Sequence, residues 1–256
     1  MAKMLALDVG NTNLVVGLYD NDHLLQSFRL FTDRTRTVDE YGVLLKKMLL
    51  DHEHDPREVE GVCVSNVVPI LTDRIEQVCR KYLRLEPLFV RAHLDLGLTV
   101  VVERPEEVGA DLLAAMVAAR QRFGAPVAVA DLGTATTISF LTDDGCFRGV
   151  IIAPGLEISM EAVLSRAPHL PPFRLEAPPQ AHGTNTIHCL QSGLLLGHAC
   201  MIDGLVERVE QELGPTQLVA TGGLAPLVGT VSRRITTVEP NLILEGIRQI
   251  WTRNRA

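Results

Sequence analysis

The feature that most constrains this 256-residue chain is a sequence pattern that occurs twice. A short apolar run leads into Asp8-Val-Gly-Asn-Thr12, followed by a strand-like run and an Asp-rich turn, and the same order returns at Asp131-Leu-Gly-Thr134. In each copy the turn aspartate, Asp20 or Asp143, comes 12 residues after the motif aspartate. Self-similarity at fixed spacing indicates a duplicated structural unit, although two hairpins of separate origin would give a similar match.

Hydrophobic periodicity and turn residues predict an α/β fold, and the repeat predicts two similar halves, taken as 1–115 and 116–256. A β-meander is expected to begin at residue 3, and further strands at 62–65, 97–102, 127–130, 138–141 and 217–221. Helices are expected at 38–51, 69–83, 105–123, 155–165, 187–212 and 241–253, with a short one after Gly223. Pro105 is expected to begin the third of these helices, because proline suits the first helical position.

Charge and cysteine content restrict the function. The net charge of −7 argues against a basic nucleic-acid-binding face. Five cysteines without a CxxC pair suggest reduced thiols in a cytoplasmic protein.

The first apolar run breaks at Asp8, too early for a signal peptide, and no stretch has 18 uninterrupted apolar residues, so no membrane partner is expected. Lysines occur only at 3, 46, 47 and 81, which excludes a phosphate-binding lysine from the last two-thirds of the chain.

The repeated Asp-x-Gly-x motif has the composition of a phosphate-binding hairpin. Glycine allows close approach of the backbone to a ligand, and successive N–H groups can bind phosphate oxygens without lysine. Because the Asp8 carboxylate would repel phosphate, it implies a divalent cation between them, Mg²⁺ with retained waters. Gly222 and Gly223, between an apolar strand and a helix, leave room for a nucleotide on the backbone. The structural alternatives are an Asx turn and an ordinary tight turn.

Asp111 is the candidate catalytic residue. It is the only charged residue between Val108 and Ala119. A carboxylate on an apolar helix is costly unless it is paired or functional, and burial raises its pKa towards that of a general base. The alternative is an aspartate that only bonds a nearby loop.

Taken together, these motifs resemble the acetate and sugar kinase, Hsp70 and actin superfamily, and the type III pantothenate kinase family in particular. The resemblance covers almost the whole chain. Its residues are Asp8-Val-Gly-Asn-Thr12, Thr37-x-Asp39-Glu40-Tyr41, Ser65-Asn-Val-Val-Pro69, Gly109-Ala-Asp111, Asp131-Leu-Gly-Thr-Ala-Thr-Thr137, Gly149-x-Ile151-x-x-Pro154-Gly155, Gly183-Thr-Asn-Thr186, Gln191-Ser-Gly193, Thr221-Gly-Gly223 and Leu244-Glu-Gly246.

The resemblance implies two ribonuclease H-like (actin-like ATPase) domains with ATP in the cleft between them. It implies a homodimeric enzyme that phosphorylates pantothenate to 4'-phosphopantothenate with ATP, the first step of coenzyme A biosynthesis. Asp111 would be the base, and Asp131 would bind a monovalent cation, K⁺ or NH₄⁺. The implied ATP-binding residues are Asp8, Val9, Gly10, Asn11, Thr12, Asn13, Leu14, Val15 and Thr134, and the implied substrate-binding residues are Gly109, Ala110, Asp111, Leu112 and Thr186.

Three positions on the substrate side depart from the family pattern. Leu112 stands where the family usually has arginine, and Val102 and Arg104 stand where it has tyrosine and asparagine. Leucine cannot replace a guanidinium that pairs with a carboxylate, so Arg104 and Arg166 are candidates to supply the missing charge. Two alternative functions follow from these departures: a kinase for another small hydroxyl acceptor, and a catalytically weak paralogue that acts as a regulatory or accessory binding protein.

Overall fold

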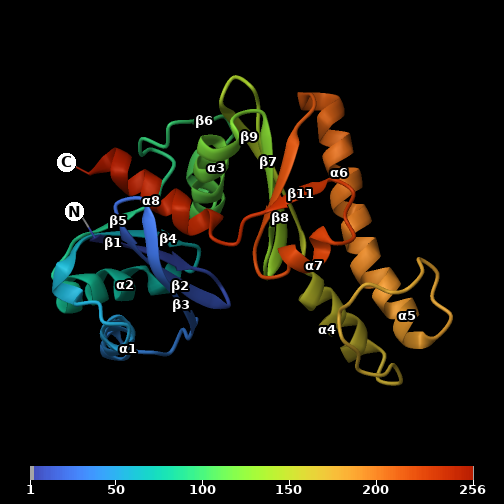
Figure 1. The fold of residues 1–256 in the computed structure, drawn as a ribbon, viewed down its shortest axis with the longest axis horizontal. Helices are drawn as coiled ribbons and strands as arrows, with labels where there is room; N and C mark the ends of the chain where they lie inside the picture. The colour runs from blue at the N-terminus through green and yellow to red at the C-terminus, as the bar shows by residue number, and fades with distance from the viewer. Residues whose placement is uncertain (1–2, 256) are drawn as a thin grey trace. The chain divides into compact units, whose positions relative to one another are not determined.

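The computed structural model describes residues 3–255, which form two compact units (Figure 1). The first comprises Met1–Leu98, Glu103–Ala118 and Leu242–Ala256, and the second Thr99–Val102 and Ala119–Asn241. The expected boundary between 115 and 116 follows chain order and falls within helix α3 (Ala110–Phe123). The last helix, α8 (Leu242–Asn254), packs instead on strands of the first unit.

A five-stranded mixed sheet forms the centre of the first unit. Its order is β3-β2-β1-β4-β5, made of β1 (Lys3–Val9), β2 (Asn13–Asp20), β3 (His23–Phe31), β4 (Val59–Asn66) and β5 (Pro87–Phe89). The first three strands are antiparallel, as the expected meander requires, while β4 and β5 run parallel to β1. Apolar residues that alternate along β2, such as Leu14, Val16 and Leu18, enter a core shared with α1 (Val38–Asp51) and α2 (Thr72–Val78).

The second unit repeats this strand order. Its sheet, β11-β10-β7-β8-β9-β6, is built from β7 (Val127–Leu132), β8 (Ala135–Leu141), β9 (Cys146–Pro154), β10 (Gln217–Thr221), β11 (Ile235–Val238) and the two-residue β6 (Thr99–Val100). Strand β7 pairs antiparallel with β8 and parallel with β10, as β1 does with β2 and β4. The duplicated α/β unit predicted from the repeat is therefore confirmed.

Helices α4 (Leu156–Arg166), α5 (Thr186–Gln191), α6 (Gly197–Leu213) and α7 (Ala225–Gly229) complete the second unit. A π-helical turn, Ser192–Leu196, joins α5 to α6 in one helical run from Thr186 to Leu213. By length and composition alone this run could cross a membrane, although charged residues such as Asp203 and Glu207 interrupt it. Its residues Leu195, Ala199, Ile202 and Val206 pack in the unit's own core, and 33% of its most apolar window is buried.

Two expected elements are shorter in the structure. The strand expected over 97–102 is only β6, Thr99–Val100. The helix expected to begin at Pro105 is a 3₁₀ turn at Pro105–Glu107, and α3 begins at Ala110. The extended backbone of Val108 (φ −68°, ψ 127°) separates the two, which moves Asp111 from the interior of a helix to its first turn.

Candidate active site

The first Asp-x-Gly-x-Thr motif is the hairpin between β1 and β2. Gly10 N–H donates to the Asn13 carbonyl at 3.0 Å, and this bond closes a tip at which Asn11 and Thr12 are exposed. Val9 and Leu14, on either side, are buried in the core. Of the residues expected to bind ATP, Asn11 and Thr12 therefore present side chains to solvent, whereas Val9 and Leu14 have their side chains in the core.

Asp8 lies at the end of β1, beside the parallel strand β4. The register places it opposite Ser65, whose fully buried hydroxyl donates to Asp8 Oδ1 at 3.0 Å. A hydrogen bond to a carboxylate stabilises the ionised form and fixes its orientation. Ser65 belongs to the motif Ser65-Asn-Val-Val-Pro69, but the sequence does not predict it as a site residue, because its contact with Asp8 joins two strands across 57 residues of the chain.

The second motif forms the matching hairpin between β7 and β8. Gly133 N–H donates to the Ala135 carbonyl at 3.1 Å, and Thr134 is exposed at the tip. Asp131 occupies the register position of Asp8, with Thr221 of β10 where Ser65 stands in the first unit. A Cβ on Gly155 would lie 2.2 Å from the Thr134 carbonyl oxygen, so only glycine lets this segment approach the hairpin so closely.

The paired glycines after β10 lie against this hairpin. Gly222 has φ +92°, and a Cβ there would lie 2.5 Å from Asp131 Oδ1 and 2.7 Å from the Leu132 backbone. The Leu224 N–H donates to the Leu132 carbonyl at 3.2 Å. Two motifs identified separately in the sequence, at Asp131 and at Gly222, are thus adjacent in the second unit.

Asp111 is the second residue of α3, and its carboxyl is largely withdrawn from solvent. Burial raises its pKa above the ordinary aspartate value, while hydrogen bonds from backbone N–H groups, including that of Leu112 at 2.8 Å, oppose the shift. The positive end of the α3 dipole also favours the carboxylate. A desolvated carboxyl with a raised pKa is suited to accept a proton.

The other substrate-side residues differ in exposure. Ala110 is buried, and Leu112 is only 8% exposed. Arg104, one candidate for the missing charge, is paired with Glu107 at 2.7 Å. Arg166 is exposed in the last turn of α4. Thr186 is exposed at the start of α5, where Asn185 caps the helix, and it belongs to the second unit whereas Asp111 belongs to the first.

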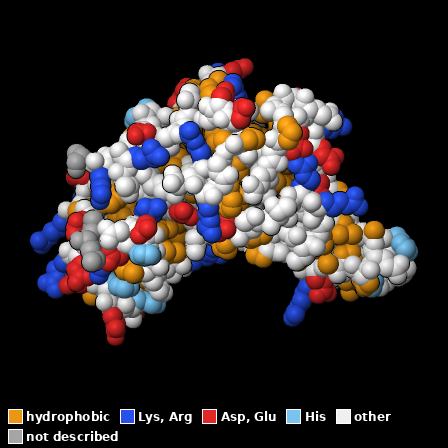
Figure 2. Space-filling model, turned by 45° about the horizontal axis from the view of Figure 1, so that its top comes forward, with side chains coloured by type: hydrophobic (Ala, Val, Ile, Leu, Met, Phe, Trp, Pro, Cys, Tyr) orange, Lys and Arg blue, Asp and Glu red, His pale blue; other side chains and the backbone are white. Residues whose placement is uncertain are grey.

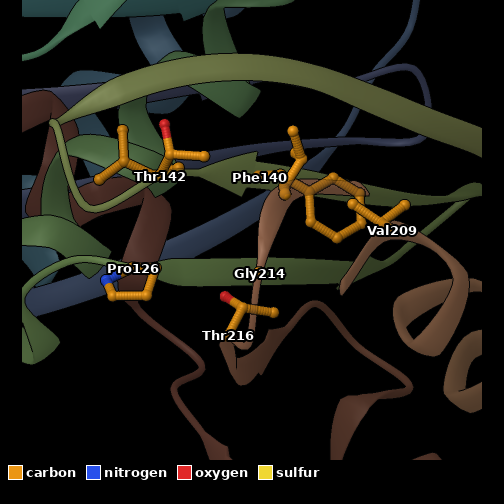
Figure 3. Close-up of a pocket in the computed structure, with 8 residues that line it drawn as sticks. Pro126, Phe140, Thr142, Val209, Gly214 and Thr216 are labelled. Carbon is orange, nitrogen blue, oxygen red and sulfur yellow. The ribbon is translucent and has the colours of Figure 1, made fainter. Parts of the chain in front are cut away.

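Within residues 3–255, no group of three or more His, Cys, Asp or Glu side chains could hold a metal ion. A small pocket lies in the second unit between β8 and the end of α6 (Figure 3). Its volume of about 10 Å³ suffices for one water molecule. None of the expected site residues lines it, so it is not a candidate for the nucleotide site.

Another contact at the first hairpin was not expected from the sequence. Arg34, in the segment between β3 and α1, donates through Nη2 to Asn11 Oδ1 at 3.1 Å. The sequence signal was an arginine between a strand end and the Thr37–Glu40 capping box, in a chain with few lysines.

Comparisons with known proteins agree with this geometry. The family model for type III pantothenate kinase matches residues 4–208. Proteins named type III pantothenate kinase are 46% identical over 254 residues in Roseiflexus sp. (strain RS-1) and 41% identical over 252 residues in Exiguobacterium sibiricum. These alignments cover 99% and 98% of this chain and 100% of each relative.

Solved structures share the fold at lower sequence identity. An inorganic polyphosphate/ATP-glucomannokinase from Arthrobacter sp. strain KM has a TM-score of 0.53 at 17% identity and covers 98% of this chain and 99% of its own. The ethanolamine utilization protein EutJ from Carboxydothermus hydrogenoformans has a TM-score of 0.56 at 12% identity, covering 98% and 90%. The two sheets with one strand order are the actin-like, sugar-kinase fold, and the chain belongs to the type III pantothenate kinase family.

Proposed function

We propose that Asp111 is the general base with which this kinase phosphorylates pantothenate to 4'-phosphopantothenate in coenzyme A biosynthesis. The carboxylate takes the proton of the primary hydroxyl as the oxygen attacks the γ-phosphorus of ATP, and ADP leaves. The observation that carries this role is the desolvated carboxyl of Asp111 in the first turn of α3. The raised pKa brings its basicity closer to the operating pH, as general-base catalysis requires.

The two hairpins are the proposed phosphate-binding elements. In the first unit, Asp8 to Val15 offer the exposed Asn11 and Thr12 side chains and backbone N–H groups. In the second unit, Thr134, Gly222 and Gly223 offer a hydroxyl and open backbone. Mg²⁺ bound to the ATP phosphates neutralises charge on the transferred group. Asp8, held by Ser65, is the proposed residue that faces this ion.

Asp131 is the proposed ligand of a monovalent cation, K⁺ or NH₄⁺. Asp131 lies at the end of β7, and no group of three or more metal-ligating side chains in the described chain competes for a multiply charged ion, so its single carboxylate suits a singly charged one. Gly222 lies close to Oδ1 of that carboxylate, where a side chain would displace one of the two. Asp131→Ala should remove the difference in activity between K⁺ and a large organic cation, and an unchanged K⁺ response would place the ion elsewhere.

Pantothenate is proposed to bind along residues 109–112 and at Thr186. Leu112 offers no charge for the substrate carboxylate, and Arg104 already pairs with Glu107. Compared with relatives that have arginine at this position, we therefore expect weaker binding of pantothenate. Arg166, exposed on α4, remains the candidate to compensate.

We further propose that the kinase is a cytoplasmic homodimer. Figure 2 shows hydrophobic side chains gathered at the end of the second unit that carries α4 and α5. The exposed apolar residues of that unit include Ile158, Val163 and Ile187, and Ile152 of β9 is 69% exposed. Contiguous exposed apolar surface of this kind is typical of a protein interface. All five cysteines are free thiols, as expected in a reducing compartment. Light scattering coupled to size exclusion tests the dimer.

Steady-state kinetics of Asp111→Asn test the proposed base. We expect a loss of about 10²–10⁴-fold in kcat, since this is what general-base help contributes. Asp143→Asn, in the exposed β8–β9 turn, is the matched control and should keep wild-type activity. Activity of Asp111→Asn within about threefold of wild type would remove Asp111 from the mechanism.

A further inference from the structure

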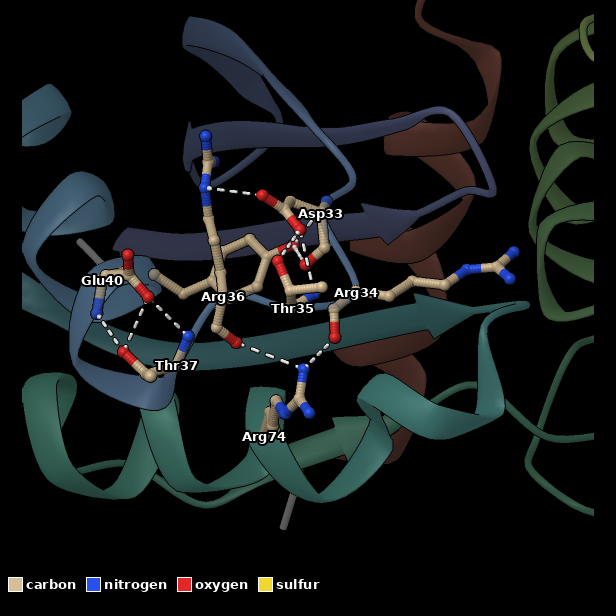
Figure 4. Close-up of polar contacts among 8 residues, drawn as sticks. Asp33, Arg34, Thr35, Arg36, Thr37, Glu40 and Arg74 are labelled. Carbon is tan, nitrogen blue, oxygen red and sulfur yellow. Dashed lines mark hydrogen bonds and ion pairs between the residues drawn. The ribbon is translucent and has the colours of Figure 1, made fainter.

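The loop between β3 and α1, residues 32–37, is bonded directly to the first hairpin, and Figure 4 shows its polar contacts with α1 and α2. Thr32 N–H donates to the Thr12 carbonyl at 2.9 Å, and the buried Thr32 hydroxyl donates to the Gly10 carbonyl at 2.7 Å. Each bond ends on a residue of the hairpin tip. Two hydrogen bonds therefore fasten the loop to the tip.

The other side of the loop is fastened to two helices. The buried Tyr41 hydroxyl of α1 accepts from Asp33 N–H at 2.9 Å and donates to the Asp33 carbonyl at 2.8 Å. The Arg74 guanidinium of α2 donates to the carbonyls of Arg34 and Arg36. The backbone of Arg34 is thus held on both sides, while its side chain is exposed.

Arg34 differs from its neighbours in how its charge is used. Arg36 pairs with Asp33 at 3.8 Å and lies over the Tyr41 ring. The Arg34 guanidinium donates to Asn11 Oδ1, which is neutral, and within residues 3–255 it forms no salt bridge. No carboxylate therefore compensates the positive charge of the Arg34 guanidinium, which lies at the tip of the hairpin.

The lysines of the chain offer little charge to a polyphosphate. Three of the four lysines pair with acids: Lys3 with Glu58, Lys47 with Asp51 and Lys81 with Asp39. Arginine has a planar fork of donors that matches phosphate oxygens, so it can bind Asn11 and a phosphate at once. The bond to Oδ1 also orients the Asn11 amide, so that its Nδ2 group is the end it offers to a ligand.

We propose that Arg34 binds a phosphate oxygen of ATP at the first hairpin, and that the braced loop exists to hold it there. This inference rests on the proposed function of the hairpin as a phosphate-binding element. Because the loop is already ordered, little entropy is lost when the nucleotide binds. Arg34 is thus the cation in the first unit that takes the role of a phosphate-binding lysine.

The test compares the binding of ATP and adenosine to Arg34→Gln, Arg34→Lys and wild type by calorimetry. Because Arg34→Gln loses a charge-assisted hydrogen bond to phosphate, we expect it to bind ATP about tenfold to a hundredfold more weakly and to bind adenosine as wild type does. Arg34→Lys should recover part of the loss, because it keeps the charge without the fork. Arg57→Gln removes the same charge from an arginine whose side chain is 90% exposed, and it should bind ATP as wild type does.

The ratio of the two affinities within one protein does not depend on its folded fraction, so partial unfolding cannot imitate the expected result. Equal ATP-to-adenosine ratios in wild type and Arg34→Gln would overturn the role of Arg34 and leave the kinase assignment intact. Equal losses in Arg34→Gln and Arg57→Gln would overturn it too, because the effect would then be long-range charge alone. Failure of the wild type to bind ATP would instead overturn the proposed function.

Discussion

Gly222→Ala should reveal how tightly the second hairpin and the Gly-Gly turn are fitted together. At φ +92° an alanine costs about 1–2 kcal/mol in backbone strain. Its Cβ would also lie 2.5 Å from Asp131 Oδ1 and 2.7 Å from the Leu132 backbone, where contacts below 3.0 Å force something to move. The Leu132 side of the contact is strand backbone, so the added atom displaces either the carboxylate or the turn.

We expect Gly222→Ala to lose about 2–3 kcal/mol of stability, which lowers Tm by about 4–12 °C in a chain of this size. Since a displacement of about 1 Å in a catalytic site can cost about 10²-fold in rate, kcat should fall by a similar factor. Differential scanning fluorimetry and a coupled ADP-release assay measure the two effects.

The adjacent residue supplies the matched control for stability. A Cβ on Gly223 would meet nothing within 4 Å, and its φ is not in the left-handed region. Gly223→Ala should therefore leave Tm unchanged or raise it slightly, because alanine reduces the entropy of the unfolded chain. Equal Tm values for the two alanine variants would refute the argument that Gly222 is required by close packing against Asp131.

Three further predictions concern the first unit. Ser65→Ala removes the buried hydrogen-bond donor to Asp8 and should lower kcat/KM for ATP, measured by initial rates, about tenfold. Ser65→Thr keeps a hydroxyl and should retain part of the wild-type kcat/KM. Burial raises the pKa of Asp111, so the ionised carboxylate destabilises the fold at neutral pH. At pH 7, Asp111→Asn should therefore unfold at a higher urea concentration than wild type. This gain in stability should shrink as pH falls through the raised pKa and be absent below about 3.8, where the carboxyl is protonated in both folded and unfolded chains. Leu112→Arg should lower the KM for pantothenate about tenfold or more, with little change in the KM for ATP. Its Tm should fall, because Leu112 is buried. An increase in the KM for pantothenate would show that another arginine binds the carboxylate.

The repeat and most elements could be predicted because they depend on local patterns. Helix α1 has the predicted limits, since Thr37 and Glu40 form a capping box and an apolar stripe follows. The position of Asp111 in its helix could not be predicted, because the extended backbone of Val108 separates the turn at Pro105 from α3. The backbone conformation of one residue decided that outcome.

Contacts between distant segments also escaped prediction. Ser65 meets Asp8 across 57 residues and Arg34 meets Asn11 across 23. Such pairs depend on strand order and on how the loop after β3 folds back, which no local pattern encodes. The hairpin motifs themselves were visible because glycine, asparagine and threonine are needed within a few residues of each other.

The packing of α8 on the first unit has a consequence for how the protein is made. Gly246 lies against the Ala114 carbonyl of α3, and Trp251 covers Gly61 of β4, so the last helix covers strands formed near the N-terminus. At about 5–20 residues per second, the ribosome needs roughly 7–30 s to pass from residue 98 to residue 242. During that interval the N-terminal sheet lacks helix α8, which later packs on it. The second unit, in contrast, has all its residues before α8 is synthesised. The half made first is thus the half completed last.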